Sequence, residues 1–428
     1  MLIEFTVGNF LSFKEPVTLS MVAANTKARD PKVNENNTIV VNDKLKLLTS
    51  AAIYGANASG KSNLVLALNF MWQFVLSSSK DSQSGEPINV SPFRLSAVSE
   101  KEPSFFQIVF WLHGTQYRYG FEATNEKITA EWLFSVPTTR EALLFAREDR
   151  DIKVTSKFKE GKGLEQRTRA NALFLSVAAQ FDGQVAQEIL GWFRRVAFVS
   201  GLDDTAYRNF TIAQFANHGA MRSEIIKLIR NLDVDIVDIF HENIDKSQMP
   251  LPADMPEELK TLILRSVKDK ITTIKTVHQK WDENGQPSTT IAFDIEEESA
   301  GTQKLFYLSG LLVHILKSGD LMVIDEMEAR LHPLMTCAIL KLFCSLETNP
   351  NRAQLIFTTH DTNLLSNKLF RRDQIWFIEK DQQSSSHLYS LAEIKVRNDA
   401  SFESDYIEGR YGAIPYLGDI QQITLDEK

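Results

Sequence analysis

Residues 55–62 read Gly-Ala-Asn-Ala-Ser-Gly-Lys-Ser and fit the pattern GxxxxGK[ST] of phosphate-binding loops. The residues before them, 51–54 (Ala-Ala-Ile-Tyr), predict a short buried strand, and apolar residues after them predict an amphipathic helix. Glycines let the backbone between strand and helix curl, so that N–H groups and the positive end of the helix face an anion. We therefore expect a nucleoside triphosphate to bind here.

The residue types of this loop predict separate roles. Lys61 is expected to reach the β- and γ-phosphates, and the Ser62 hydroxyl is expected to ligate Mg²⁺. The residues expected to surround the phosphates are Gly55, Asn57, Ala58, Ser59, Gly60, Lys61, Ser62 and Asn63. The alternative is a plain glycine-rich turn, which the flanking strand and helix disfavour.

Composition limits the class of protein further. The chain has 428 residues, of which 43% are hydrophobic, enough for two or three folding units. It shows no apolar stretch of membrane-spanning length and no secretory signal, so we expect a cytoplasmic protein without a membrane partner. Its net charge of −8 disfavours a basic nucleic-acid coat. Cys337 and Cys344 lie about 10 Å apart along one predicted helix, too far for a disulfide.

A second strand is predicted to deliver carboxylates. Residues 321–324 (Leu-Met-Val-Ile) predict an apolar strand that ends in Asp325 and Glu326. We expect Asp325 to hold Mg²⁺ and Glu326 to orient and polarise an attacking water. A buried strand with a solvated acidic end is the alternative, and the phosphate loop favours the functional interpretation.

A third apolar strand is predicted at residues 354–358 and is followed by Thr-His-Asp. A histidine after a buried strand is more often a polar terminus than a catalyst. The order of phosphate loop, acidic strand and strand with His360 resembles that of ATP-binding-cassette ATPases, in which such a histidine contacts the γ-phosphate. This resemblance makes His360 a candidate catalytic residue.

The same resemblance implies a signature element that meets the γ-phosphate of another subunit. Residues 308–312 (Leu-Ser-Gly-Leu-Leu) lie inside an apolar run, where helix N–H groups would already be bonded. Residues 299–303 (Ser-Ala-Gly-Thr-Gln) instead open the predicted helix, so that free N–H groups and its positive end face an anion. We choose Ser299 and Gly301, with an ordinary serine N-cap as the alternative.

Taken together, the chain resembles the prokaryotic AAA-15/AAA-21 group of ABC-type ATPases, relatives of the structural-maintenance and RecF-like ATPase heads. The segments that carry the resemblance are Val7–Phe13, Ser299–Thr302, Asp325–Pro333 and Asp405–Pro415. The resemblance implies ATP as the nucleotide, ATPase activity, and a homodimer or larger even-numbered oligomer with shared sites. One copy would offer the phosphate loop, Asp325, Glu326 and His360, and another Ser299 and Gly301.

The expected fold class is α/β: an ABC-type P-loop ATPase with mixed and antiparallel sheets in two lobes, a compact mostly helical insertion and no long coiled coil. The expected parts are a first lobe (1–160), the insertion with a hairpin (161–298) and a second lobe (299–428). Antiparallel strands are predicted at 105–112, 117–123 and 128–134, helices between 171 and 232, and a hairpin at 282–285.

Several members of the family are ATPase subunits of anti-phage systems, of the AriA (PARIS) and RloA types. The resemblance implies a bacterial defence ATPase that senses a trigger, such as a phage product, and holds or releases an effector, such as a Toprim-type nuclease. One alternative is a DNA repair or recombination ATPase of the RecF/SMC-like class, although direct DNA binding is not favoured. Another is a nucleotide-dependent scaffold that needs no turnover.

Four features leave alternatives open. His332 either begins a helix or crosses a subunit interface, and residues 406–415 form either a brace, which we favour, or a partner site. No lid glutamine is evident, although Phe93 lies in that region. Six basic residues favour a solvated face over a nucleic-acid contact: Lys153, Lys157, Lys159, Lys162, Arg167 and Arg169.

Overall fold

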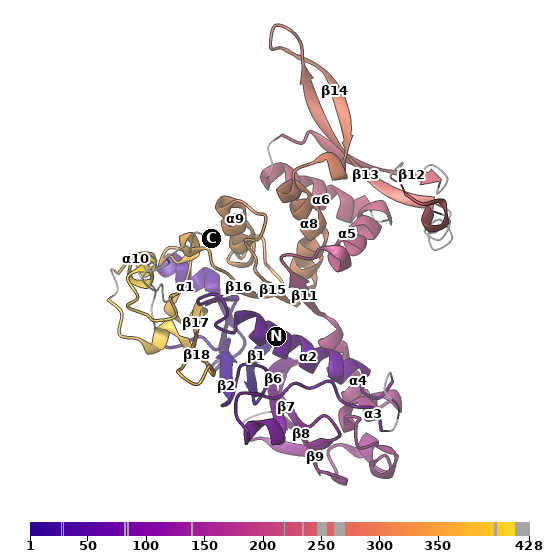
Figure 1. Cartoon of the computed structure of the whole chain (residues 1–428), viewed down its shortest axis with the longest axis vertical. Coiled ribbons are helices and arrows are strands. Elements are labelled where there is room, and N and C mark those ends of the chain that lie inside the picture. Colours follow the sequence, from indigo (N-terminus) through magenta and orange to yellow (C-terminus); the bar gives the residue numbers. More distant parts are fainter. Residues whose placement is uncertain are drawn as a thin grey trace, which may run out of the picture. The chain divides into compact units, whose positions relative to one another are not determined.

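The computed structural model describes residues 1–26, 28, 30–80, 83, 85–137, 140–217, 219–232, 235–245, 255–260, 270–397 and 400–415. The chain packs as two compact units (Figure 1). Unit 1 comprises Met1–Phe198, Gly319–Met327 and Leu340–Lys428, and unit 2 comprises Val199–Ser318 and Glu328–Ile339. The division into three parts, with boundaries at residues 160 and 298, was based on the order of the motifs along the chain and stays a prediction.

Unit 1 contains a seven-stranded antiparallel sheet of order β10-β9-β8-β7-β6-β1-β2. Its strands are β1 (Leu2–Gly8), β2 (Val17–Ser20), β6 (Ser104–Leu112), β7 (Thr115–Ala123), β8 (Ile128–Val136), β9 (Ala142–Glu148) and β10 (Asp151–Val154). Buried and half-buried residues alternate along much of β6 and β8, as expected for strands with one face on a core. The predicted antiparallel strands are confirmed.

The second sheet of unit 1 is mixed, with the order β11-β15-β16-β5-β17-β18. Its strands are β5 (Ser50–Tyr54), β11 (Val196–Ser200), β15 (Leu321–Asp325), β16 (Gln354–Thr358), β17 (Ile375–Lys380) and β18 (Ser386–Ser390). Strands β15, β16, β5 and β17 pair in parallel, and β18 pairs antiparallel to β17. All residues of β5 and β16 are buried, which explains their continuous apolar runs.

Helix α2 (Lys61–Ser77) lies between the two sheets, because it contacts β1 of one and β15 of the other. Its buried residues include Leu64, Leu68 and Met71, so the predicted helix after the phosphate loop is confirmed. Trp72 packs on Phe193 with ring centroids 4.9 Å apart. The remaining elements of the unit are α1 (Pro31–Asn37), β3 (Thr38–Val40), β4 (Lys46–Leu48), α3 (Phe174–Gln180), α4 (Gln184–Arg194) and α10 (Phe402–Ile407).

A buried ionic cluster ties the antiparallel sheet to α3. The Glu131 carboxylate accepts hydrogen bonds from the backbone N–H groups of Phe174 (2.6 Å) and Leu175 (3.0 Å) and from the Tyr119 hydroxyl (3.0 Å). The Arg147 guanidinium lies 3.9 Å from the same carboxylate, and both side chains are almost fully buried. Burial raises the pKa of Glu131, and Arg147 is the main group that opposes this shift.

Unit 2 combines helices with a three-stranded antiparallel sheet of order β12-β13-β14. Its elements are α5 (Thr205–Asn217), α6 (Gly219–Leu232), β12 (Asp238–Asp245), β13 (Lys270–Trp281), β14 (Pro287–Asp294) and α8 (Ala300–Ser318). Helix α9 (Pro333–Phe343) begins in unit 2. A Cβ atom on Gly310 of α8 would lie 2.5 Å from Thr211 Oγ1 of α5, so glycine allows these helices to pack closely.

The predicted hairpin is confirmed as β13 and β14, whose turn contains Gly285 at a φ of 70°. Strand β11 interrupts the region predicted as helical, because its residues pair with β15 in the mixed sheet. In the described residues the longest helix is α8, with 19 residues, so no long coiled coil is found there. Among the described helices, none combines the length and apolar character that crossing a bilayer requires.

Candidate nucleotide-binding site

The phosphate loop joins the end of β5 to the start of α2. A Cβ atom on Gly55 would lie 2.3 Å from the Ile378 carbonyl oxygen, and one on Gly60 would lie 2.4 Å from Ser386 Oγ. Gly60 also has a φ of 115°, which side chains of L-residues rarely allow. The two glycines of the motif are therefore required by the packing around the loop as well as by its curvature.

The loop offers groups that suit a bound phosphate. No side chain caps the N-terminus of α2, so its positive end is open to an anion. The Ser59 hydroxyl is buried without a hydrogen-bond partner. Lys61 Nζ donates to the carbonyl oxygens of Gly55 (2.9 Å) and Ala56 (3.0 Å), which holds the amine over the loop. These features fit a triphosphate with the predicted role of Lys61.

Two serines outside the motif support the loop. Ser386 Oγ donates to the Ser59 carbonyl oxygen (2.6 Å) and lies within hydrogen-bond distance of Ser12 Oγ (2.8 Å), and Asn63 Nδ2 donates to Ser12 Oγ (2.8 Å). Ser12 belongs to the N-terminal segment that resembles the family, but no site role was predicted for it. The sequence does not identify Ser386 as a site residue, because Ser386 lies on β18 and reaches the loop only in the folded protein.

The acidic strand ends beside β16, which lies between β15 and β5 in parallel register. Because parallel strands have their carboxyl ends at one edge of a sheet, Asp325 and Glu326 lie at the edge where the phosphate loop begins. The Thr358 hydroxyl donates to Asp325 Oδ1 (2.5 Å) and accepts from the Glu326 N–H (2.8 Å). Thr358 is thus a site residue that sequence reasoning missed.

Glu326 has a backbone φ of 53°, in the left-handed region. A non-glycine residue there costs roughly 1 kcal/mol or more, and such strain is common at functional sites. The hydrogen bond to Thr358 stabilises this conformation by satisfying the Glu326 N–H. The left-handed backbone changes the direction of the chain at the point where it leaves the strand.

His360 follows β16 at the same edge and is exposed. The backbone before it is fixed, since the Thr359 N–H donates to the Ile53 carbonyl oxygen (3.1 Å). The backbone after it is also fixed, since the Tyr54 hydroxyl donates to the Asp361 carbonyl oxygen (3.4 Å). The structure therefore brings together the phosphate loop, Asp325–Glu326 and His360, as the sequence predicts.

The oxygen donors at this edge suit Mg²⁺. The predicted ligands are the Ser62 hydroxyl and the Asp325 carboxylate, and Mg²⁺ prefers oxygen ligands. No group of three or more His, Cys, Asp or Glu side chains in the described residues could hold a metal. In nucleotide sites Mg²⁺ is usually bound through one or two carboxylates, water and the phosphates.

The predicted signature residues begin α8 in unit 2. Ser299 Oγ accepts from the Thr302 N–H (3.1 Å), which is the geometry of a serine N-cap. A Cβ atom on Gly301 would lie 2.9 Å from the Arg330 carbonyl oxygen. The competing Ser309 is fully buried within α8 and donates to the Phe306 carbonyl oxygen (2.6 Å). Placement at the helix start is confirmed, and the nucleotide contact stays a prediction.

His332 precedes α9, and its Nδ1 accepts from the Leu334 N–H (3.2 Å). This contact supports its role as a helix start, with Pro333 at the first helical position. The imidazole is exposed. A contact across a subunit interface stays a prediction.

The C-terminal motif packs directly against the strand that carries the phosphate loop. The Tyr406 ring of α10 stacks on Phe377 (5.4 Å between centroids) and meets Tyr54 edge-on (6.0 Å). Its hydroxyl donates to the Ala413 carbonyl oxygen (3.1 Å), and burial raises the pKa of Tyr406 to about 12. Exposed Arg410 pairs with Asp405 (3.0 Å) within the motif. These contacts support the brace interpretation.

Two other sequence features have ordinary structural explanations. Arg169 donates to the Ser79 carbonyl oxygen (3.2 Å), and the Arg167 guanidinium lies 5.7 Å from the centre of the Phe181 ring. These local contacts support a solvated face over a nucleic-acid site. Phe93 is buried, and its N–H donates to Asn9 Oδ1 (3.0 Å), so it serves the core.

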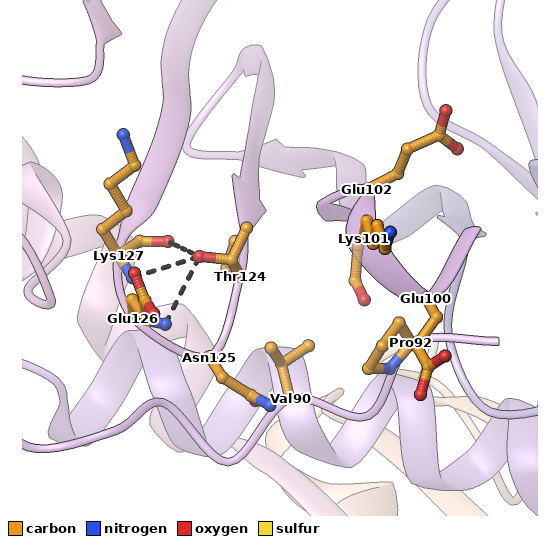
Figure 2. Close-up of a pocket in the computed structure, with 11 residues that line it drawn as sticks. Val90, Pro92, Glu100, Lys101, Glu102, Thr124, Asn125, Glu126 and Lys127 are labelled. Atoms are coloured by element: carbon orange, nitrogen blue, oxygen red, sulfur yellow. Dashed lines mark hydrogen bonds between the residues drawn. The ribbon is translucent and has the colours of Figure 1, made fainter. Parts of the chain in front are cut away.

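Figure 2 shows the residues that line a pocket, whose volume is about 400 Å³. It is lined by Val90, Pro92, residues 100–102, Ser104 and residues 123–127, none of which belongs to the predicted site. Thr124 Oγ1 already accepts from the N–H groups of Glu126 and Lys127 (3.3 Å each). The charged side chains around the pocket are exposed to solvent. They therefore need no ligand to replace lost hydration.

Comparisons with solved structures found chains of low sequence identity. The head of an SMC protein bound to the C-winged helix domain of ScpA is 13% identical, with 91% of this chain and 97% of that chain covered and a TM-score of 0.42. The recombination mediator RecF with ATP is also 13% identical, with the same coverage and a TM-score of 0.31. The protein cbiO1 of Clostridium perfringens, part of the transporter complex cbiONQ, is 12% identical, with 81% of each chain covered and a TM-score of 0.26. No curated protein matches the chain.

The predicted α/β fold is confirmed, with its mixed and antiparallel sheets. Residues 50–366 match the model of a family described as "AAA domain, putative AbiEii toxin, Type IV TA system". This match covers well over half of the chain and includes the phosphate loop, Asp325, Glu326 and His360. The chain therefore belongs to this AAA domain family.

Proposed function

We propose that this protein is an ATPase whose copies associate around ATP and Mg²⁺ and whose nucleotide state controls a toxic effector in a bacterial anti-phage defence system. The observation that carries the ATPase part is the single sheet edge at which the phosphate loop, Asp325, Glu326 and His360 meet. Each of these groups has a place in phosphoryl transfer to water.

Binding begins at the loop. Lys61 exchanges the carbonyl oxygens of Gly55 and Ala56 for the β- and γ-phosphates, and the open N-terminus of α2 faces the phosphate charge. Ser62 and Asp325 would hold Mg²⁺, which would neutralise charge on the phosphates. The Thr358 hydroxyl keeps Asp325 in place through its 2.5 Å hydrogen bond.

Hydrolysis depends on the position of two further side chains. Glu326 orients and polarises the attacking water, and the hydrogen bond from its N–H to Thr358 holds its backbone in the left-handed region. His360 contacts the γ-phosphate and completes its recognition. The signature residues Ser299 and Gly301 come from a second copy, so that ATP joins two chains and product release separates them.

The defence role rests on family evidence. The matched family is described as a putative AbiEii toxin of a type IV toxin–antitoxin system. From the sequence motifs we further infer a likeness to the AriA and RloA types of anti-phage ATPase. A Toprim-type nuclease is the proposed effector and a phage product the proposed trigger. ATP-dependent association supplies the two states that such an effector could read.

The decisive experiment measures phosphate release by the purified protein with Mg²⁺ and ATP. We expect the wild-type protein to release phosphate. In Glu326→Gln we expect the rate of release to fall at least about a hundredfold, since water activation typically contributes 10²- to 10⁴-fold. Glu347→Gln, which changes an exposed acid outside the site, is the matched control. Wild-type turnover in Glu326→Gln would refute the assignment of this strand.

A second experiment separates defence from DNA repair. Purification from the native host should retain a nuclease if the effector role is correct. Strong stimulation of turnover by DNA, with binding that weakens steeply as salt increases, would instead favour the repair alternative. A Glu326→Gln variant that protects cells as well as wild type would favour the scaffold alternative.

A further inference from the structure

A short acidic segment leads into helix α8 and the signature predicted at its start. Residues 294–298 read Asp-Ile-Glu-Glu-Glu, and a single 3₁₀ turn, η5 (Ile295–Glu297), lies between β14 and the helix. These carboxylates come directly before Ser299, where the γ-phosphate held by a second copy is proposed to bind. A carboxylate that is free to face a triphosphate repels it, so the positions of these side chains matter for the proposed site.

Three acids of this segment are at least partly exposed and have local partners. Asp294 pairs with Lys275 of β13 (2.8 Å), and Glu296 pairs with Arg208 of α5 (2.6 Å). The Glu297 carboxylate accepts from the Asp294 N–H (2.7 Å). Because water and counterions reach these three groups, their charge is screened.

Glu298, the residue next to the signature, is held differently. Its side chain is only 13% exposed and lies against two residues of β13. The hydroxyl of the fully buried Thr276 donates to Glu298 Oε1, and His278 Nε2 lies 2.7 Å from the same oxygen. A carboxylate with so little access to water depends on such hydrogen bonds, so the loss of one favours its turning out to solvent.

The backbone of Glu298 is also tied to the first turn of α8. Its carbonyl oxygen accepts from Gln303 Nε2 (2.8 Å), and the Gln303 N–H donates to the Ser299 carbonyl oxygen (2.9 Å). Ser299 Oγ accepts in turn from the Thr302 N–H (3.1 Å). Glu298 thus joins β13 through its side chain to the signature turn through its main chain. Because one planar peptide links Glu298 to Ser299, a shift of the first residue moves the second.

We propose that Glu298 is a positioning residue for the signature, a role that rests on the shared site of the proposed function. Thr276 and His278 hold its carboxylate on β13 and away from the γ-phosphate. The fixed carboxylate in turn fixes Ser299 and the first turn of α8. The three-stranded sheet of unit 2 thereby influences the rate of ATP turnover through contacts within its own unit.

The test replaces Thr276 by valine, which has nearly the same shape but no hydroxyl group. In Thr276→Val we expect kcat for phosphate release to fall about tenfold to hundredfold, since a misplacement of about 1 Å can cost that much. The affinity for ADP with Mg²⁺, measured by calorimetric titration, should equal that of wild type, because the signature is expected to meet the γ-phosphate that ADP lacks. Thr276→Ser retains a hydroxyl group and should restore most of the rate.

Thr272→Val is the matched control for this substitution. It makes the same change on the same strand, but the Thr272 hydroxyl donates to Asn243 Oδ1 of β12 (2.9 Å) and not to Glu298. We expect this variant to release phosphate at the wild-type rate.

A mixing experiment separates positioning of the signature from a general loss of structure. Thr276→Val mixed with Lys61→Ala should regain turnover, because unlike chains combine an intact loop with an intact signature. Random pairing makes half of the pairs unlike, each with one intact site of two, so the recovered rate should be about a quarter of wild type. Thr276→Val mixed with Ser299→Arg should stay slow, because both chains then carry a defective signature.

Two results would overturn the proposal while the shared site stands. They are wild-type turnover in Thr276→Val, and a slow Thr276→Val that Lys61→Ala does not rescue although it rescues Ser299→Arg. Failure of the proposed function gives a different result, because wild type then releases no phosphate or the mixture of Ser299→Arg with Lys61→Ala stays inactive. That mixture therefore distinguishes loss of the positioning role from loss of the shared site itself.

Discussion

Lys61 provides the positive charge that faces the triphosphate in the proposed site. Replacing it by alanine removes its hydrogen bonds to phosphate, each worth about 1.5–3 kcal/mol, so we expect ATP affinity to fall at least about tenfold to hundredfold. Calorimetric titration with ATP and Mg²⁺ measures this change. Lys80→Ala, at an exposed position beyond the other end of α2, should bind like wild type. Equal affinity of Lys61→Ala would place the phosphates elsewhere.

Thr358 holds both acidic residues through one hydroxyl group. Thr358→Val removes that hydroxyl and leaves the Glu326 N–H without its partner, at a cost of about 1–3 kcal/mol. We expect turnover to fall about tenfold to hundredfold while ATP affinity changes little. Thr358→Ser retains the hydroxyl and should restore most activity. A Thr358→Ser variant as slow as Thr358→Val would show that packing, not hydrogen bonding, is what matters.

Single residues also show where sequence reasoning stops. Lys61, Asp325 and His360 are predictable because each lies in a motif next to a recognisable strand. Thr358 and Ser386 are not, because their roles arise only when β16 and β18 take their places beside β15 and β5 in the sheet. A hydroxyl that supports a site leaves no spacing pattern in the chain.

At the scale of elements, α10 acts as a brace for β5. Tyr406→Ala removes an aromatic ring that contacts Phe377 and Tyr54, and we expect about 3 kcal/mol of destabilisation. Tyr406→Phe loses only the hydrogen bond to Ala413, worth about 1 kcal/mol. Denaturant unfolding of the full chain measures both. An Ala variant as stable as the Phe variant would exclude the brace.

The buried pair of Glu131 and Arg147 gives a pH-dependent prediction. Arg147→Met leaves the carboxylate without its cation, which typically costs about 3–5 kcal/mol near neutral pH. Burial already raises the pKa of Glu131 in the folded state, and the loss of Arg147 raises it further. A raised folded pKa means that stability is retained at acid pH and lost as pH rises through that pKa.

The destabilisation of Arg147→Met should therefore be smaller at acid pH than at alkaline pH, as denaturant unfolding at several pH values would show. Arg118→Met, which breaks a partly exposed pair with Glu141, is the matched control and should cost about 1 kcal/mol or less. A cost for Arg147→Met that does not vary with pH would mean that Glu131 is not the group responsible.

Elements differed in how well the sequence predicted them. Strands β6, β7 and β8 were predictable because apolar and polar residues alternate and turns separate them. Strand β11 was not, since residues 196–200 continue the apolar pattern of α4 and become a strand only by pairing with β15. Tertiary pairing decides such short segments.

For the whole molecule, the central prediction is that ATP sites are shared between copies. Ser299→Arg places a bulky cation at the predicted signature, and Lys61→Ala disables the phosphate loop. Each variant alone should be inactive. A mixture should regain turnover, because a pair of unlike chains combines one intact loop with one intact signature. Phosphate release by the mixture at equal concentrations measures this, with each variant mixed with itself as control. No recovery on mixing would place the complete site within one chain.

The order of strands in the mixed sheet has a consequence for synthesis. Strand β5 and its phosphate loop leave the ribosome early, but β5 lies between β16 and β17, which are encoded some 300 residues later. At roughly 5–20 residues per second, the loop waits on the order of 15 to 60 seconds for its neighbours. A nascent or prematurely terminated chain therefore carries the complete motif without the sheet that supports it. The protein can become competent to bind nucleotide only after β16 and β17 have been translated.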